Sequence, residues 1–213
     1  MTVDERMLDF ILSLETDESQ IIQTIEQEAK DTYVPIIRKE MRQLLRVLLT
    51  IKKPRTVLEV GTAIGFSAIL MAECLDEESH ITTIEKYEKR IPIARENFRR
   101  AGFSDRITLL EGDAAPILAG LTETYDMIFM DAAKGQYIHF LPDVLRLLAP
   151  GGVLVSDNVL QDGDVVESRY AVVRRNRTIH SRMRDYLWTM KHTPELQTVI
   201  LPIGDGATVS VKR

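Results

Sequence analysis

The chain has 213 residues, of which 45% are hydrophobic and 28% are charged, and its formal net charge is −5. This length is enough for one well-buried domain and does not require two, so we treat residues 1–213 as a single domain. The negative total argues against a protein that coats nucleic acid. The absence of an apolar stretch of roughly 18 residues argues against a membrane span, and the acidic N-terminus is unlike a signal peptide, so we expect a cytoplasmic protein.

Charge is distributed unevenly along the chain. Residues 1–31 contain nine acidic and two basic side chains, whereas residues 166–191 contain seven basic and two acidic ones. Residues 1–31 are expected to form one or two helices, and Ile36–Ile51 is predicted to be a strongly apolar helix. We therefore predict a helical extension over residues 1–51 in front of a core over residues 56–213.

Short β-branched apolar runs alternate with helical patterns from Thr56 onward, which predicts an α/β fold with a mainly parallel sheet. The predicted strands are Thr56–Val60, Ile81–Ile84, Ile107–Leu110, Tyr125–Met130 and Gly152–Ser156. Apolar residues at helical spacing predict a helix that contains Tyr87, Ile91, Ala94, Phe98 and Ala101 and that ends at Gly102. Cys74 lies in another apolar helical run and, as the only cysteine, is predicted to be a buried core thiol.

The chain ends with two alternating apolar runs, Thr198–Ile203 and Thr208–Val211, on either side of the turn Gly204-Asp205-Gly206. This pattern predicts a β-hairpin, so the last strand is expected to be antiparallel to its neighbour.

Three predicted strand ends carry groups suited to a nucleoside cofactor. The first strand leads into Gly61-Thr-Ala-Ile-Gly65, a turn that lets backbone N–H groups approach a ligand but lacks the middle glycine of a pyrophosphate loop. Glu85 can accept hydrogen bonds from both ribose hydroxyls, and Asp113 can bind an adenine amine with Ala114 beside the ring. A glycine turn with two such acids and no phosphate loop indicates S-adenosylmethionine. The alternative is a strand-end charge for Glu85 and a helix N-cap for Asp113.

Asp131, Asp157 and Asn158 each follow a predicted buried strand, so they are expected at one edge of the sheet. Three hard oxygen ligands suit Mg²⁺, which leaves positions open for water or substrate. The alternative is that Asp and Asn only end strands and cap helices.

Five ordered segments, LEVGTAIGFSA, TIEKYEKR, EGDA, FMDAAKGQY and SDNVL, resemble the class I metal-dependent O-methyltransferases of the catechol and caffeoyl-CoA type. The resemblance extends from about Val34 to Arg213 and implies a Rossmann-like fold with a seven-stranded, mostly parallel sheet whose last strand is antiparallel, preceded by N-terminal helices. Within this group, VPII, the cluster Arg174-Arg175-Asn-Arg177 and the ending ILPIGDGATVS are most similar to the bacterial tRNA 5-hydroxyuridine methyltransferases.

The resemblance also implies roles for individual residues. It implies cofactor contacts for Ile37, Gly61, Ser67, Glu85, Asp113, Ala114 and Asp131. It also implies that Mg²⁺ or another divalent cation is bound by Asp131, Asp157 and Asn158. Lys134 matches the lysine that removes the acceptor proton. Ile37 could instead belong to the core helix, Ser67 could be only a first-turn residue, and Lys134 could be a solvated loop residue. A homodimer is also implied.

The basic segment at residues 166–191 suggests what kind of substrate the protein binds. Arginine side chains beside a metal pocket suit phosphate, so Arg174, Arg175 and Arg177 are candidate contacts to tRNA, whose wobble 5-hydroxyuridine would become 5-methoxyuridine. A solvated helix face is the alternative for these arginines. Two other functions remain open, a small-molecule catechol O-methyltransferase and a non-catalytic module that binds S-adenosylmethionine or RNA.

Overall fold

The computed structural model describes residues 5–213. Its helices are α1 (Glu5–Ser13), α2 (Gln20–Asp31), α3 (Lys39–Lys52), α4 (Phe66–Cys74), α5 (Ile91–Arg100), α6 (Ala114–Gly120), α7 (Tyr137–Leu147) and α8 (Arg177–His192), with short 3-10 helices η1 (Lys134–Gln136), η2 (Gln161–Val166) and η3 (Arg174–Asn176). Its strands are β1 (Thr56–Val60), β2 (His80–Glu85), β3 (Ile107–Glu111), β4 (Tyr125–Met130), β5 (Leu148–Ser156), β6 (Leu196–Leu201) and β7 (Ala207–Lys212).

The strands form one seven-stranded sheet in the order β3-β2-β1-β4-β5-β7-β6. Strands β1 to β5 pair in parallel, and β7 is antiparallel to both β5 and β6. This confirms the predicted Rossmann-like α/β fold and its antiparallel last strand. The strand order reverses between β1 and β4, and in such sheets ligands bind beyond the carboxyl ends of the strands at that reversal.

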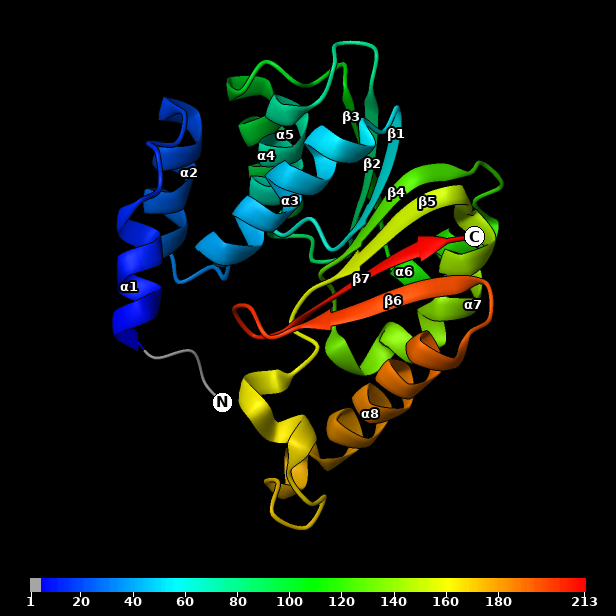
Figure 1. Ribbon diagram of the computed structural model, residues 1–213. Helices are drawn as coiled ribbons and strands as arrows, with labels where there is room; N and C mark the ends of the chain where they lie inside the picture. Colours follow the sequence, from blue (N-terminus) through cyan, green and yellow to red (C-terminus); the bar gives the residue numbers. More distant parts are fainter. Residues whose placement is uncertain (1–4) are drawn as a thin grey trace.

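Both faces of the sheet are covered by helices (Figure 1). Side chains alternate between the faces along each strand, so Met127 and Phe129 of β4 join the core under α2, α3, α4 and α5, while Ile128 and Met130 join the core under α6, α7 and α8. Continuous apolar runs such as β4 are therefore explained by burial on two sides. Residues 5–31 form α1 and α2, in line with the predicted helices, and the remainder of that prediction lies outside the described residues.

Two predicted helix starts were wrong by one turn. Helix α3 begins at Lys39 rather than Ile36, because Arg38 has extended backbone angles and the preceding Ile37 is buried in the core. Helix α5 begins at Ile91 rather than near Tyr87, because the Glu85 carboxylate accepts the N–H groups of Lys86 and Tyr87 and holds that segment in a loop. A local hydrogen-bond acceptor therefore overrides the apolar spacing.

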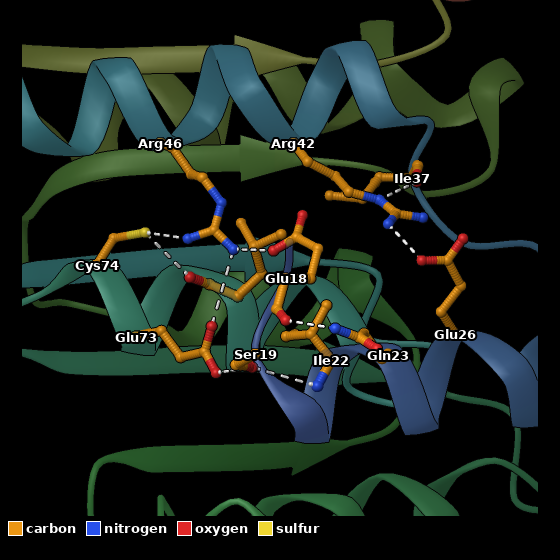
Figure 2. Close-up of polar contacts among 11 residues, drawn as sticks. Glu18, Ser19, Ile22, Gln23, Glu26, Ile37, Arg42, Arg46, Glu73 and Cys74 are labelled. Carbon is orange, nitrogen blue, oxygen red and sulfur yellow. Dashed lines mark hydrogen bonds and ion pairs between the residues drawn. The ribbon is translucent and has the colours of Figure 1, made fainter. Parts of the chain in front are cut away.

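A buried ion pair joins α2 to α3 (Figure 2). The guanidinium of Arg42, which is 3% exposed, donates to Glu26 of α2 at 2.7 Å and to the carbonyl of Ile37 at 3.2 Å. It also stacks over the ring of Phe66, the first residue of α4, at 4.6 Å from the ring centre. Arg42 thus fixes Ile37 relative to the start of α4.

Cys74 packs against the apolar core but is only half-buried, so it is less buried than predicted. It is the last residue of α4, where its sulfur faces the charged side chain of Arg46 on α3 (Figure 2). Arg46 donates to the sulfur at 3.3 Å, and the thiol donates to the Leu70 carbonyl at 3.3 Å. Burial raises the pKa of the Cys74 thiol more strongly than Arg46 lowers it, which disfavours a reactive thiolate.

Candidate functional site

A pocket of about 680 Å³ lies beyond the carboxyl ends of the central strands. It is lined by the turn after β1, by residues after β2, β3, β4 and β5, by the segment before α3 and by the β6–β7 turn. Because β1 and β4 are neighbours at the reversal of strand order, the pocket occupies the position expected for a ligand site in this fold.

The glycine turn after β1 requires glycine for a steric reason. Gly61 has φ +107°, and a Cβ atom on it would lie 2.1 Å from the carbonyl oxygen of Asp131. The N–H groups of Gly61 and Thr62 both donate to the Ile84 carbonyl at 3.1 Å, which ties this turn to β2. The close approach of the turn to Asp131 brings the predicted cofactor and metal residues to one wall of the pocket.

Glu85 lines the pocket with its carboxylate held by backbone groups. One oxygen accepts from Ala63 N at 2.8 Å, and the other accepts from Lys86 N at 2.9 Å and Tyr87 N at 2.8 Å. These contacts fix the orientation of the carboxylate without a cation. Carboxylate oxygens have several lone pairs, so ribose hydroxyls can still donate to it.

Ser67 lies one residue into α4, is 6% exposed and lines the pocket. Its hydroxyl donates to Glu59, which is fully buried in β1 and also accepts from Thr83. Burial raises the pKa of Glu59 to about 7. Glu59 is not among the predicted site residues, although an acid inside an otherwise apolar strand is itself an indication of a buried polar network.

Asp113 and Ala114 lie where β3 gives way to α6. The Asp113 carboxylate caps the helix by accepting from Ala115 N at 3.0 Å, and this hydrogen bond is the main reason that its pKa is lowered. Asp113 remains exposed on the pocket wall, with the Lys86 amine 3.5 Å away, and Ala114 lines the same wall. Capping and ligand binding are thus compatible for Asp113. Ile37, 4% exposed, closes the pocket from the segment before α3.

Asp131, Asp157 and Asn158 line the other half of the pocket. Asp131 N donates to the Val60 carbonyl at 3.0 Å and Asp157 N donates to the Met130 carbonyl at 2.9 Å, so the strand ladder places the two aspartates side by side. Asn158 follows with a left-handed φ of +58°. Burial raises the pKa of Asp131 to about 6, and burial together with the neighbouring Asp131 carboxylate raises the pKa of Asp157 to about 7.

The donor chemistry of these three residues fits a hard divalent cation. Two buried carboxylates destabilise each other when both are ionised, and a divalent cation between them would remove that repulsion. Within residues 5–213, no three or more His, Cys, Asp or Glu side chains are grouped so that they could hold a metal ion. The proposed ligand set differs from such a group because it combines two carboxylates with the amide of Asn158.

Lys134 lines the pocket at the start of η1, and its partner, Asp205, is not among the predicted site residues. The amine of Lys134 donates to the Asp205 carboxylate at 2.7 Å, and Asp205 is only 4% exposed. The two residues are 71 positions apart in the sequence, and Asp205 was considered only as part of a hairpin turn. Sequence spacing gave no indication that the hairpin reaches the pocket.

The arginines proposed to contact tRNA do not line the pocket. Arg174 and Arg175 lie on η3 and are exposed to solvent. Arg177 instead donates to the carbonyls of Val172 and Tyr170, each at 3.1 Å, and so holds the segment before α8 in place.

In the part of the chain that the structure describes, no helix is both long enough and apolar enough to cross a membrane.

Comparisons with known proteins agree with this geometry. A family model described as O-methyltransferase matches residues 12–213. Caffeoyl-CoA O-methyltransferase 2 from Populus trichocarpa is 30% identical over 181 residues, which cover 78% of this chain and 70% of that protein. Catechol O-methyltransferase from Niastella koreensis is 36% identical over 129 residues, covering 59% of this chain and 58% of that protein.

A solved structure supports the same relationship. The O-methyltransferase from Bacillus cereus, crystallised in complex with SAH, superposes with a TM-score of 0.85 at 25% identity and covers 96% of each chain. The family match, the similar relatives and the shared fold together show that the chain belongs to the O-methyltransferase family, as an S-adenosylmethionine-dependent enzyme of the catechol and caffeoyl-CoA type.

Proposed function

We propose that the enzyme depends on a divalent cation, Mg²⁺ in the first place, and methylates a hydroxyl whose neighbouring carbon carries a second oxygen. The observation that carries this proposal is that one pocket is lined both by Glu85 and Asp113 and by Asp131, Asp157 and Asn158. A cofactor along the first group would present its methyl group to an acceptor held at the second. Alignment of two reactants in this way can contribute roughly 7 to 11 kcal/mol to lowering the barrier.

Different side chains would bind the cofactor and the cation. Glu85 would accept the ribose hydroxyls and Asp113 the adenine amine, while Ile37 and Ala114 would cover the apolar faces of the cofactor. The side chains of Asp131, Asp157 and Asn158 would hold the cation. When bound, such an ion lowers the pKa of a coordinated hydroxyl and fixes two adjacent acceptor oxygens. Lys134 would take the proton of that hydroxyl.

The acceptor that we propose is 5-hydroxyuridine at the wobble position of tRNA, whose O5 and O4 are adjacent oxygens. Exposure of Arg174 and Arg175 supports this acceptor, because exposed arginines in a basic segment are suited to phosphate. The second candidate acceptor is a small catechol, whose two hydroxyls are also adjacent. The 36% identity to a catechol O-methyltransferase favours it.

One assay separates these possibilities. Labelled S-adenosylmethionine is incubated with the enzyme and either tRNA carrying 5-hydroxyuridine or free catechol, with and without EDTA and with Mg²⁺ restored afterwards. We expect transfer to the tRNA that is lost on chelation and recovered with Mg²⁺. Transfer that survives complete chelation would contradict the cation dependence, and efficient catechol turnover without tRNA turnover would assign the enzyme to the second acceptor.

A further inference from the structure

We propose that Asp205 is a positioning residue for Lys134, which holds the lysine amine at the acceptor end of the pocket and stabilises the ammonium that forms there. The inference rests on the proposed role of Lys134 as the proton acceptor. Asp205 lies in the turn between β6 and β7 and reaches the pocket from the opposite end of the sequence.

The contact between the two side chains is close and shielded from water. The Lys134 Nζ to Asp205 Oδ2 distance is 2.7 Å, and the Asp205 side chain is 4% exposed while that of Lys134 is 32% exposed. Ion pairs that are partly buried are less screened by solvent and salt than surface pairs. This pair therefore differs from the exposed ion pairs elsewhere on the protein, such as Arg146 with Asp143 on α7.

The turn that carries Asp205 is attached firmly to the segment after β5. The Asp205 carbonyl accepts from Leu160 N at 2.9 Å, the Gly206 carbonyl accepts from Val159 N at 3.0 Å, and the second carboxylate oxygen of Asp205 accepts from Asp162 N. Gly206 has φ +84°, and a Cβ on it would lie 2.2 Å from Leu160. The carboxylate consequently has little freedom to move away from Lys134.

The loop that carries Lys134 is held on its other side by α8. Arg182 donates to the Gly135 carbonyl at 3.1 Å, which fixes the backbone beside Lys134. The carboxylates of Asp131 and Asp157 also interact electrostatically with Lys134, and Arg38 and Asp162 line the same pocket. Asp131 and Asp157 are the proposed cation ligands, so Asp205 is the carboxylate that would remain available to the lysine.

The balanced step assigns one role to each residue. The O–H bond of the acceptor breaks, its proton goes to the neutral amine of Lys134, and the electron pair stays on oxygen. That oxygen forms the new bond to the methyl carbon as the carbon–sulfur bond breaks, and the electron pair of this bond goes to sulfur. Asp205 touches neither reactant, and it stabilises the positive charge that appears on Lys134.

The first test is Asp205→Asn, which keeps the size of the side chain and removes its charge. We expect kcat on the high-pH plateau, where the lysine is neutral in both proteins, to fall by about 10- to 100-fold because the amine is no longer held towards the acceptor. This loss is part of the roughly 100- to 10,000-fold that a general base contributes. The Kd of S-adenosylmethionine by calorimetry should change less than about twofold. The rising limb of kcat against pH should move to lower pH, because the ammonium has lost its stabilising carboxylate. Asp143→Asn, in the exposed ion pair of α7, is the matched control and should leave kcat unchanged.

The second test does not depend on turnover. Acylation of Lys134 by an amine-reactive ester at pH 8, followed by peptide mass spectrometry, reports the fraction of neutral amine. We expect labelling in Asp205→Asn to be several-fold faster than in the wild type, because the amine no longer donates to the Asp205 carboxylate. Equal labelling rates, or an unchanged kcat and pH profile, would overturn the role of Asp205.

Lys134→Met distinguishes this inference from the proposed function. If Lys134→Met is inactive while Asp205→Asn behaves as the wild type, the positioning role is wrong and the proton acceptor stands. If Lys134→Met retains full activity, the proposed proton acceptor is wrong. Thermal unfolding of both variants shows whether a loss of activity reflects a loss of folded protein.

Discussion

Gly61 is the residue at which the cofactor turn meets the metal end of the pocket. Its φ of +107° is in the left-handed region, and the Asp131 carbonyl occupies the space where a Cβ would lie. Backbone cannot move aside as a flexible side chain can, so a larger residue would push the β1 turn away from Asp131. The close approach of the two halves of the site therefore requires a residue without a Cβ atom at position 61.

We predict that Gly61→Ala destabilises the protein by about 3 kcal/mol, from overpacking and left-handed strain together, and weakens S-adenosylmethionine binding at least tenfold. Gly102→Ala is the control, because Gly102 has φ +75° but nothing within 4 Å of an added Cβ. It should cost about 1 to 2 kcal/mol and leave cofactor affinity unchanged. Urea unfolding and calorimetry measure both effects, and equal cofactor affinity in the two variants would contradict the steric argument.

Individual site residues were predictable from the sequence where they directly follow a predicted strand. Asp131, Asp157 and Asn158 follow buried strands, and parallel pairing of β4 with β5 brings such residues together without further information. Asp205 could not be predicted, because its position depends on how the hairpin turn attaches to Val159 and Leu160. Long-range pairing of loops has no local pattern in the sequence.

Helices α2 and α3 support the cofactor end of the pocket through one buried ion pair. Arg42 contacts Glu26 on α2 and the carbonyl of Ile37 (Figure 2). It also lies over the ring of Phe66. The hydrogen bond from Arg42 lowers the pKa of Glu26 to about 2, well below its ordinary value of 4.5. A lowered pKa means that the ionised pair stabilises the folded state above about pH 4.5 and that this stabilisation is lost as pH falls through about 2.

We predict that Glu26→Gln lowers the free energy of unfolding at pH 7 by about 1 to 3 kcal/mol, since the charge of Arg42 is left without its partner. The difference between variant and wild type should shrink as pH falls from 4.5 towards 2, as followed by urea unfolding at several pH values. Glu96→Gln, in an exposed pair with Arg99 on α5, is the control and should show little change at any pH. A difference for Glu26→Gln that does not depend on pH would point to lost packing instead of lost charge.

Strands were easier to predict than helix starts in this chain. Four predicted strands agree with β1, β2, β3 and β4 to within one residue at each end, because each is a short run rich in β-branched and apolar residues. Strand β5 extends back to Leu148 through an irregular register that includes Pro150 and two glycines, which apolar pattern alone does not reveal. The starts of α3 and α5 depend on what Ile37 and Glu85 contact, and those contacts exist only in the folded protein.

Two segments of the molecule carry opposite net charge. Residues 1–31, which include α1 and α2, have an excess of acidic side chains, whereas residues 166–191, which include η3 and most of α8, have an excess of basic ones and lie away from those helices (Figure 1). Such a separation can orient a polyanion so that it approaches the basic side first. The proposed tRNA acceptor therefore depends on electrostatic attraction at Arg174 and Arg175, whereas a small catechol would not.

We predict that the logarithm of the tRNA association constant falls linearly with the logarithm of salt concentration, and that Arg174→Ala with Arg175→Ala makes this slope shallower. Each phosphate contact contributes about 0.7 to 0.9 to the slope, so the double variant should differ from the wild type by about 1.4 to 1.8. Filter binding between about 50 and 200 mM KCl, a range over which phosphate contacts weaken measurably, provides the measurement. Arg95→Ala with Arg99→Ala on α5 removes the same charge outside the basic segment and should leave the slope unchanged. If both double variants change the slope equally, the attraction reflects net charge alone and η3 makes no direct contact with the RNA.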